Sequence, residues 1–196
     1  LQVEILFNGT ADSMRRRVLA PLKRGLKKHL AEDSKKVKVL DIATGTGRTL
    51  QQIQSALPEV ELYGLDLSSS YLKQASKYLS SRDGDLVQLT KGNAENMPYA
   101  SRSFQALTCV FLFHELPREA RQNVLNECFR LLEPGGTLIL ADSIQIEDSP
   151  KFTSIMENFH KIFHEPYYRD YIIDNINLRL EESGFSSITS ESHFMT

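Results

Sequence analysis

From Val37 onward the chain alternates short apolar stretches with longer stretches of helical periodicity. The short stretches are typical of strands and the longer ones of amphipathic helices. Strands that alternate with helices form βαβ units, and these wind into a parallel sheet. The sequence therefore predicts an α/β fold, a Rossmann-like, doubly wound, mostly parallel sheet with helices on both faces. The expected strands are Val37–Ala43, Val60–Leu67, Asp85–Thr90, Phe104–Phe113, Thr137–Ile146 and a sixth from Phe185 towards Phe194.

Residues that begin and end helices support this order. The first helix of the series is expected from Thr49 to Leu57, and Ser68 is expected to cap the next one, which runs to Leu79. Pro117 lies in the first turn of the helix after the fourth strand, and Glu-Pro-Gly-Gly at 133–136 ends it. A last helix, Tyr171 to Ser183, is expected to end at Gly184.

Residues 1–36 are basic and helix-prone, with interruptions expected at Pro21 and Gly25. Leucines and valine at helical spacing predict an amphipathic helix that packs on the domain and leaves its basic face in water. The alternative use of this face is contact with an anionic membrane surface, whereas we expect no nucleic-acid partner. We therefore expect an N-terminal helical cover at 1–36 and one domain at 37–196. An aromatic-rich insertion at 142–170 is expected to cover the active site.

The composition narrows the class of protein further. A formal net charge of -2 argues against a general polyanion binder, and no apolar stretch is long enough for a transmembrane helix. Cys109 and Cys128 lie in apolar stretches, which indicates reduced packing residues and a reducing compartment. That compartment is the cytoplasm, or an organelle such as a plastid if an upstream transit segment was removed. Because the chain starts with Leu1 and leaves little room for a final antiparallel strand, we expect a truncated sequence. The oligomeric state stays open.

The segment Val39–Arg48, with the sequence VLDIATGTGR, carries the chemistry. A strand that contains Asp41 runs into a turn with Gly45 and Gly47, and this turn opens a helix. Asp66 ends the second strand, where a carboxylate can hold both hydroxyls of a ribose. A dinucleotide site wants a third glycine, but that position holds Leu50. A ligand with a ribose and no phosphate fits better, and S-adenosylmethionine is such a ligand.

Four motifs in this order resemble those of the class I S-adenosylmethionine-dependent methyltransferases, in the form found in ubiquinone/menaquinone-type enzymes. They are Asp41–Gly47 (DIATGTG), Gly64–Ser68 (GLDLS), Gly92–Pro98 (GNAENMP) and Leu132–Leu138 (LEPGGTL). The resemblance runs from about Lys36 to the C-terminus and implies the class I methyltransferase fold, with its final antiparallel strand cut short here.

The resemblance also implies a set of cofactor-binding residues. Asp66 would hold the ribose, and Asn93 to Glu95 would line the adenine. The backbone of Phe111 would contact the methionine end of the cofactor. The full implied set is Asp41, Ala43, Thr44, Gly45, Gly47, Asp66, Leu67, Asn93, Ala94, Glu95 and Phe111. Two positions depart from the family. Ala43 replaces a glycine, which costs little unless the backbone there needs a positive φ. The quinone-type signature after the fourth strand is replaced by FLFHELP at 111–117.

His114 and Asp142 follow the fourth and fifth strands, which are neighbours in this fold, and together they could act as a general base. The alternative is that His114 only hydrogen-bonds its own loop. We expect no metal. His160 and His164 stand four residues apart, with Glu115 and Glu165 as further candidate ligands, but surrounding aromatic residues explain these histidines more simply.

The sequence thus predicts methyl transfer from S-adenosylmethionine, by SN2 displacement, to a small apolar or aromatic molecule, with S-adenosylhomocysteine as product. Aromatic residues between Phe152 and Tyr171 indicate that kind of acceptor. Two alternatives stay open: an NAD(P)-type Rossmann oxidoreductase, and a non-catalytic module that binds S-adenosylmethionine or S-adenosylhomocysteine.

Overall fold

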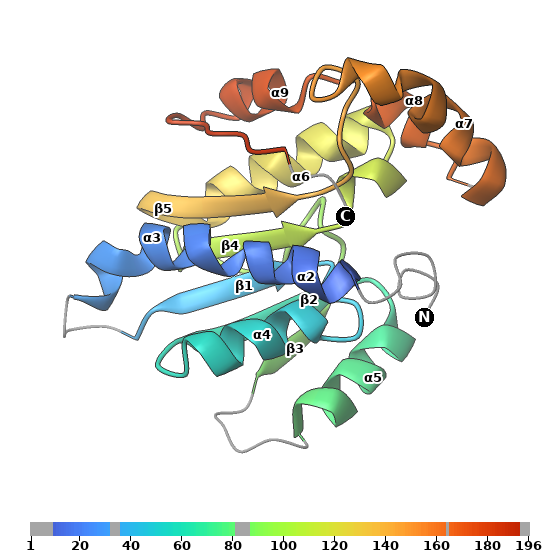
Figure 1. Ribbon diagram of the computed structural model, residues 1–196. Coiled ribbons are helices and arrows are strands. Elements are labelled where there is room, and N and C mark those ends of the chain that lie inside the picture. Colours follow the sequence, from blue (N-terminus) through green and yellow to red (C-terminus); the bar gives the residue numbers. More distant parts are fainter. Residues whose placement is uncertain (1–9, 32–35, 81–86, 164, 193–196) are drawn as a thin grey trace. The chain divides into compact units, whose positions relative to one another are not determined.

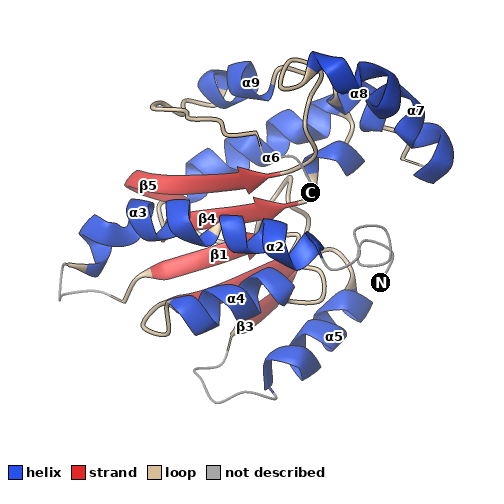
Figure 2. Ribbon diagram, in the orientation of Figure 1, coloured by secondary structure: helices blue, strands red, loops and turns tan. Residues whose placement is uncertain are grey.

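The computed structural model describes residues 10–31, 36–80, 87–163 and 165–192 (Figure 1). Its sheet has five strands, all pairs parallel, in the order β3-β2-β1-β4-β5 (Figure 2). This order, in which the chain moves outward from β1 in both directions, confirms the predicted α/β fold with a doubly wound sheet. The strands are β1 Lys38–Ile42, β2 Glu61–Asp66, β3 Gln88–Lys91, β4 Phe104–Val110 and β5 Leu132–Ala141.

The chain divides into two compact units. The first unit comprises Leu1–Val110 and Arg130–Ala141, and it holds the sheet with α2 Thr10–Arg17, α3 Leu19–Leu30, α4 Arg48–Ala56 and α5 Ser69–Ser80. The second comprises Phe111–Phe129 and Asp142–Thr196. It holds the 3-10 turns η1 Phe113–Glu115 and η2 Pro150–Phe152, most of α6 Arg118–Leu131, and the helices α7 Thr153–Phe163, α8 Tyr168–Tyr171 and α9 Ile176–Glu182. The predicted division at residue 36 stays a prediction.

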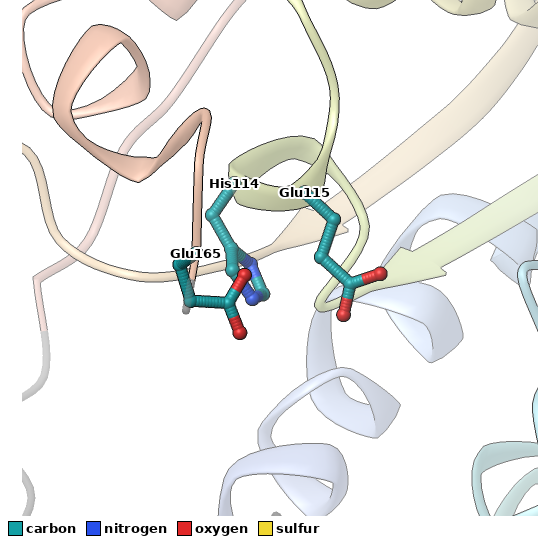
Figure 3. Close-up of side chains that lie close together, drawn as sticks. All are labelled: His114, Glu115 and Glu165. Atoms are coloured by element: carbon teal, nitrogen blue, oxygen red, sulfur yellow. The ribbon is translucent and has the colours of Figure 1, made fainter. Parts of the chain in front are cut away.

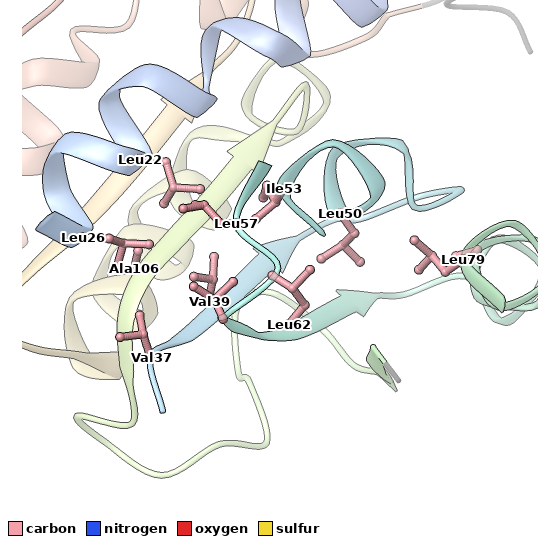
Figure 4. Packing of buried hydrophobic residues seen from close by; sticks show 12 residues of the cluster. Leu22, Leu26, Val37, Val39, Leu50, Ile53, Leu57, Leu62, Leu79 and Ala106 are labelled. Carbon is pink, nitrogen blue, oxygen red and sulfur yellow. The ribbon is translucent and has the colours of Figure 1, made fainter. Parts of the chain in front are cut away.

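The core of the first unit lies between the sheet and helices α3, α4 and α5 (Figure 4). Leucines on α3 and α4 interlock with the apolar side chains of β1, β2 and β4. Every residue of β4 is buried, as its continuous apolar run predicts for a strand between two neighbours. Within the described part of the chain, no helix is both long and apolar enough to cross a membrane.

The N-terminal segment differs from the prediction at Pro21 and Gly25, because α3 runs through both. Pro21 lies in the first turn of α3, where its missing N–H costs no hydrogen bond. Gly25 faces β5, and a Cβ there would lie 2.5 Å from Oγ1 of Thr137. The glycine therefore allows helix and sheet to approach closely. Leu22 and Leu26 are fully buried, whereas the basic side chains of α3 are exposed.

The observed ends of strands β4 and β5 differ from the predicted ones. β4 ends at Val110, three residues early, because Phe111 has a left-handed backbone with φ of 61°. β5 starts at Leu132 and contains the Glu-Pro-Gly-Gly segment, with an irregular register opposite Phe104 to Ala106. It ends at Ala141 rather than Ile146, because Asp142 leaves the sheet to bind backbone N–H groups of the second unit.

The C-terminal predictions need two corrections. The helix expected over 171–183 is split into α8 and α9, because the chain turns at Asp174 and the Asn175 side chain caps α9 by accepting from the Leu178 N–H. Gly184 ends α9 as predicted, with φ of 101°. The expected sixth strand is absent from the described residues 185–192, since Ser187 is left-handed (φ 58°) and most side chains there are exposed. Residues 193–196 lie outside the described part.

Candidate functional site

The turn between β1 and α4 is built from left-handed residues. Ala43, Gly45 and Gly47 have φ of 55°, 54° and 81°, and Gly47 is the residue before the first turn of α4. The Gly47 N–H donates to the Thr44 carbonyl (2.9 Å), which closes the turn. A Cβ on Gly47 would lie 3.1 Å from the Cβ of Ala75 on α5, so this glycine is also needed for packing. The turn brings backbone N–H groups to the start of α4, where they can meet a ligand's acceptor atoms.

Ala43 is the strained member of this turn. Its φ is positive, the condition under which alanine in place of glycine carries a cost. A left-handed conformation costs an L-residue roughly 1–2 kcal/mol. Strain of this kind persists only where the surrounding structure holds it, and it gathers at functional sites.

Asp41 is a buried carboxylate that stabilises the turn by hydrogen bonding. Its side chain is 1% exposed, and its two oxygens accept hydrogen bonds from the hydroxyls of Thr44 (2.7 Å) and Thr108 (2.6 Å). Burial raises the pKa of Asp41 from 3.8 to about 6, against the two hydroxyl hydrogen bonds, which lower it. Asp41 thus connects Thr44 of the turn with Thr108 of β4. Thr108 was not predicted from the sequence, although a hydroxyl inside an apolar strand was a signal of a buried polar partner.

Asp66 ties the end of β2 to the same turn. One carboxylate oxygen accepts the Gly45 N–H and the other accepts the Ser68 N–H, both at 2.8 Å. Each oxygen keeps a second lone pair, so the carboxylate can still accept from two neighbouring hydroxyl groups of a ribose. Leu67 comes directly after it and is 68% exposed, which leaves an apolar side chain uncovered beside this carboxylate.

The turn after β3 completes this edge of the sheet. The Gly92 N–H donates to the carbonyl of Asp66 (3.1 Å), which places the turn beside β2. The Asn93 side chain accepts the Glu95 N–H (3.0 Å), and the Asn96 N–H donates to the Asn93 carbonyl (3.1 Å). Carboxyl ends of parallel strands are where such sheets bind ligands. The structure thus brings all the predicted cofactor residues of the first unit to turns at one edge.

The second unit holds the predicted pair of His114 and Asp142. Nδ1 of His114 lies 2.6 Å from Oδ1 of Asp142, so the histidine is oriented and its Nε2 remains for another partner. The other Asp142 oxygen accepts the Phe113 N–H (2.7 Å). Partial burial lowers the pKa of His114, but the hydrogen bond and charge of Asp142, with the charges of Glu115 and Glu165, raise it above its usual value of 6.5 overall. The Phe111 backbone, predicted as a cofactor contact, is left-handed in this unit.

Aromatic rings surround His114. The rings of Tyr168 and Tyr171 meet it edge-on, with centroids 6.2 and 6.3 Å away. Tyr171 is fixed in turn, because its hydroxyl donates to the Ser143 carbonyl (2.6 Å). The pKa of Tyr171 is well above 10 because the phenol is buried, so it stays a neutral donor. Tyr168 and Tyr171, from the aromatic segment, thus lie beside the histidine, and the predicted cover of an active site stays a prediction.

Two glutamates also lie close to His114 (Figure 3). The ligand-type atoms of His114, Glu115 and Glu165 all lie within 4.8 Å of one another, a set that could hold a cation. The same carboxylates act as counter-charges for a protonated histidine, which is the simpler role for them. The other two histidines considered for a metal, at 160 and 164, have side chains outside the described part of the chain. The expectation of no metal stays a prediction.

Known proteins resemble this chain in sequence. Residues 39–136, half of the chain, match a family described as a methyltransferase domain. The chain belongs to the methyltransferase domain family. The demethylmenaquinone methyltransferase of Lactiplantibacillus plantarum is 30% identical over 173 residues, covering 83% of this chain and 68% of that protein. That of Thermotoga maritima is 37% identical over 123 residues, covering 63% of this chain and 50% of that protein.

Solved structures show the same fold. A protein of Bacillus halodurans described as a methyltransferase is 26% identical, with a TM-score of 0.67, over 85% of this chain and 68% of that one. A Haemonchus contortus phosphoethanolamine N-methyltransferase in complex with S-adenosyl-L-methionine shares the fold alone, at 18% identity and a TM-score of 0.60, over 87% of this chain and 37% of that one. The fold is thus that of class I methyltransferases, as predicted. The chain spans about half the length of some curated relatives that it matches.

Proposed function

We propose that this chain binds S-adenosylmethionine through the turns at the carboxyl ends of β1, β2 and β3 and transfers its methyl group to a small molecule. The observation that carries the proposal is the pair of hydrogen bonds that Asp66 accepts from Gly45 and Ser68. They join the glycine turn to a carboxylate suited to ribose hydroxyls. Leu67 offers an apolar face for an adenine ring, and the turn at Asn93 offers backbone groups for its edge.

The acceptor that the chain's own residues favour carries a ring and an ionisable hydroxyl. Bound S-adenosylmethionine would supply the methyl group, which would pass to the acceptor oxygen by SN2 displacement and leave S-adenosylhomocysteine. Nε2 of His114 takes the proton of the hydroxyl, while Asp142 holds the ring through Nδ1 and stabilises the imidazolium that forms. The edges of Tyr168 and Tyr171 favour an apolar or aromatic acceptor. The names of the relatives, demethylmenaquinone methyltransferases, point in the same direction.

Cofactor binding is tested by calorimetry with S-adenosylhomocysteine, S-adenosylmethionine and NADH. We expect the first two ligands to bind and NADH not to bind. Asp66→Asn should weaken binding at least about tenfold, because one charge-assisted contact to a ribose is lost. Glu61→Gln, a change at the opposite end of the same strand, is the matched control and should bind normally. Tight NADH binding without S-adenosylhomocysteine binding would favour the oxidoreductase alternative.

The base is tested with an acceptor found by screening small phenols and quinols. His114→Gln should lower kcat about a hundredfold, the usual contribution of a general base, with little change in the affinity for S-adenosylhomocysteine. Dialysis against EDTA should leave turnover unchanged, because a His–Asp pair needs no metal. Loss of turnover that Mg²⁺ restores would instead assign the cluster of His114, Glu115 and Glu165 to a cation. Cofactor binding without turnover on any acceptor would favour the non-catalytic module.

The exposed basic face of α3 supports a second interaction of this protein, with a membrane surface. Lys23, Arg24, Lys27 and Lys28 are exposed on one side, while Leu22 and Leu26 anchor the other in the core. We propose peripheral contact of this face with anionic lipid, which would suit an apolar acceptor. Co-sedimentation with phosphatidylglycerol vesicles that is lost at high salt would support it. The reducing compartment likewise remains a proposal, in keeping with the two free, buried cysteines.

A further inference from the structure

The second unit contains a fully buried arginine that the reaction described above does not use. Arg121, on α6, has 0% of its surface exposed. Arginine is almost never fully buried unless it is paired, because removing its charge from water is costly. Here the charge is met by two carboxylates: Asp174 lies 2.5 Å and Asp170 lies 3.0 Å from its Nη1.

The remaining contacts of Arg121 go to backbone carbonyls. Its Nε donates to the carbonyl oxygens of Phe113 and Leu116, both at 3.1 Å. Its Nη2 donates to the Tyr167 carbonyl (3.4 Å), and the guanidinium lies 5.5 Å from the centre of the Tyr171 ring. One guanidinium therefore connects the 3-10 turn η1 with the chain around α8. Because guanidinium donors form a rigid planar fork, the positions of these partners are fixed relative to one another.

The two carbonyls that share Nε lie on either side of His114 along the chain. Phe113 and Leu116 bracket the turn η1, in which His114 is the middle residue. From the other direction, Asp142 accepts both the Phe113 N–H (2.7 Å) and Nδ1 of His114 (2.6 Å). The turn is thus held through its carbonyls by Arg121 and through an N–H and a side chain by Asp142. Without the contacts of Arg121, the turn could rotate and lengthen the hydrogen bond between His114 and Asp142.

We propose that Arg121 is a positioning residue that sets the hydrogen bond between His114 and Asp142 by clamping both ends of the η1 turn. The assignment rests on the proposed function only in giving this hydrogen bond a role in proton transfer. The clamp itself is a property of the fold and can be measured without knowing the acceptor. Lysine cannot replace arginine here, because one ammonium group cannot serve both carbonyls and the buried Asp174 in this fixed geometry.

Arg179 provides a matched control. It also pairs with Asp174, through Nε at 2.6 Å, and 15% of its side chain is exposed. Its Nη1 donates to Oε1 of Gln122 (3.3 Å), on α6, whereas the carbonyls of the η1 turn are bound by Arg121. Removing Arg179 weakens the same ionic network without touching the clamp. A role in stability alone would therefore give Arg121 and Arg179 variants the same phenotype.

The experiment compares Arg121→Lys, Arg121→Met and Arg179→Met by proton NMR and amide hydrogen exchange on the full chain. The short contact between His114 and Asp142 should give a far-downfield ring N–H resonance in the unmodified protein, assigned by its loss in Asp142→Asn. We expect Arg121→Lys to remove or shift this resonance and to speed exchange of the Phe113 amide at least about tenfold. Arg179→Met should leave both signals in place, even where it lowers the melting temperature.

Each outcome decides the question. An unchanged resonance and Phe113 exchange rate in a folded Arg121→Lys would overturn the clamp, as would equal changes in Arg179→Met. If Arg121→Met fails to fold, the lysine variant, which keeps the charge opposite Asp174, carries the test. Failure of the general-base proposal has a different signature: His114→Gln would keep full turnover while the resonance still depended on Arg121.

Discussion

Ala43 shows how one methyl group can matter in the glycine turn. Its φ of 55° is a conformation that glycine adopts freely and alanine does not. Replacing Ala43 with glycine removes roughly 1–2 kcal/mol of strain and adds about 0.4–1 kcal/mol of chain entropy to the unfolded state. We therefore expect Ala43→Gly to raise the free energy of unfolding by roughly 0.5–1 kcal/mol, measured by urea denaturation.

The same substitution in a helix should have the opposite sign. Ala20 is an exposed residue in the first turn of α3, and Ala20→Gly should lower the free energy of unfolding by up to about 1 kcal/mol, because glycine is the poorer helix former. Equal destabilisation by both variants would show that the positive φ at position 43 carries no strain.

The raised pKa of Asp41 predicts that the stability of the chain depends on pH. Its pKa is about 6 in the folded chain against 3.8 ordinarily, so the folded state keeps a proton that the unfolded state has released between these values. The contribution of this group to stability is therefore fully present below pH 4 and is lost as the pH rises through 6. Relative to Asp41→Asn, the unmodified chain should gain about 1 kcal/mol of stability between pH 7.5 and pH 5.

Urea denaturation at several pH values provides the measurement. Asp12→Asn, which removes a partly exposed carboxyl from the same unit, is measured alongside as a comparison variant. A difference between the Asp41→Asn variant and the unmodified chain that stays constant with pH would show that Asp41 titrates normally.

At the scale of elements, Gly25 decides how α3 meets the sheet. Alanine at this position would improve the helix by about 1 kcal/mol but would place its Cβ 2.5 Å from Oγ1 and 2.8 Å from Cβ of Thr137 on β5. Overpacking of this kind costs about 1–3 kcal/mol, which exceeds the gain. We expect Gly25→Ala to lower the melting temperature and Thr137→Ala to restore part of the loss in the double variant. A more stable Gly25→Ala protein would contradict the close approach.

The element boundaries that the sequence mispredicted share a physical cause. β4 was expected to continue through an apolar run that has no breaker residue, but the left-handed Phe111 ends it. The helix expected over 171–183 is broken where Asp174 turns to meet Arg121 and Arg179. In both cases a contact far along the chain, or a conformation that costs local energy, overrides the local preference that a sequence pattern records.

At the scale of the whole molecule, the two compact units differ in their proposed work. Most of the proposed cofactor residues lie in the first unit, and the His114 clamp lies in the second. We expect S-adenosylhomocysteine to slow hydrogen exchange most at residues 41–49, 64–68 and 92–96, since a ligand protects the backbone that it contacts. Residues 174–183 should change little, and mass spectrometry of peptides provides the measurement. Equal protection throughout the chain would contradict this assignment of the cofactor to the first unit.

The sequence by itself determined the alternation of strands and helices, the glycine turn, Asp66 and the family. These depend on periodicity and on residues close together in the chain, where local physics leaves few options. It also predicted that His114 and Asp142 lie close together, because neighbouring parallel strands end at the same edge of the sheet. Only the tertiary structure decided the positive φ of Ala43, the hold of Thr108 on Asp41 and the burial of Arg121. Each of these features depends on partners supplied by distant segments or on a dihedral angle set by the surrounding packing. Such causes produce no periodic pattern in the sequence, so the sequence alone does not predict them.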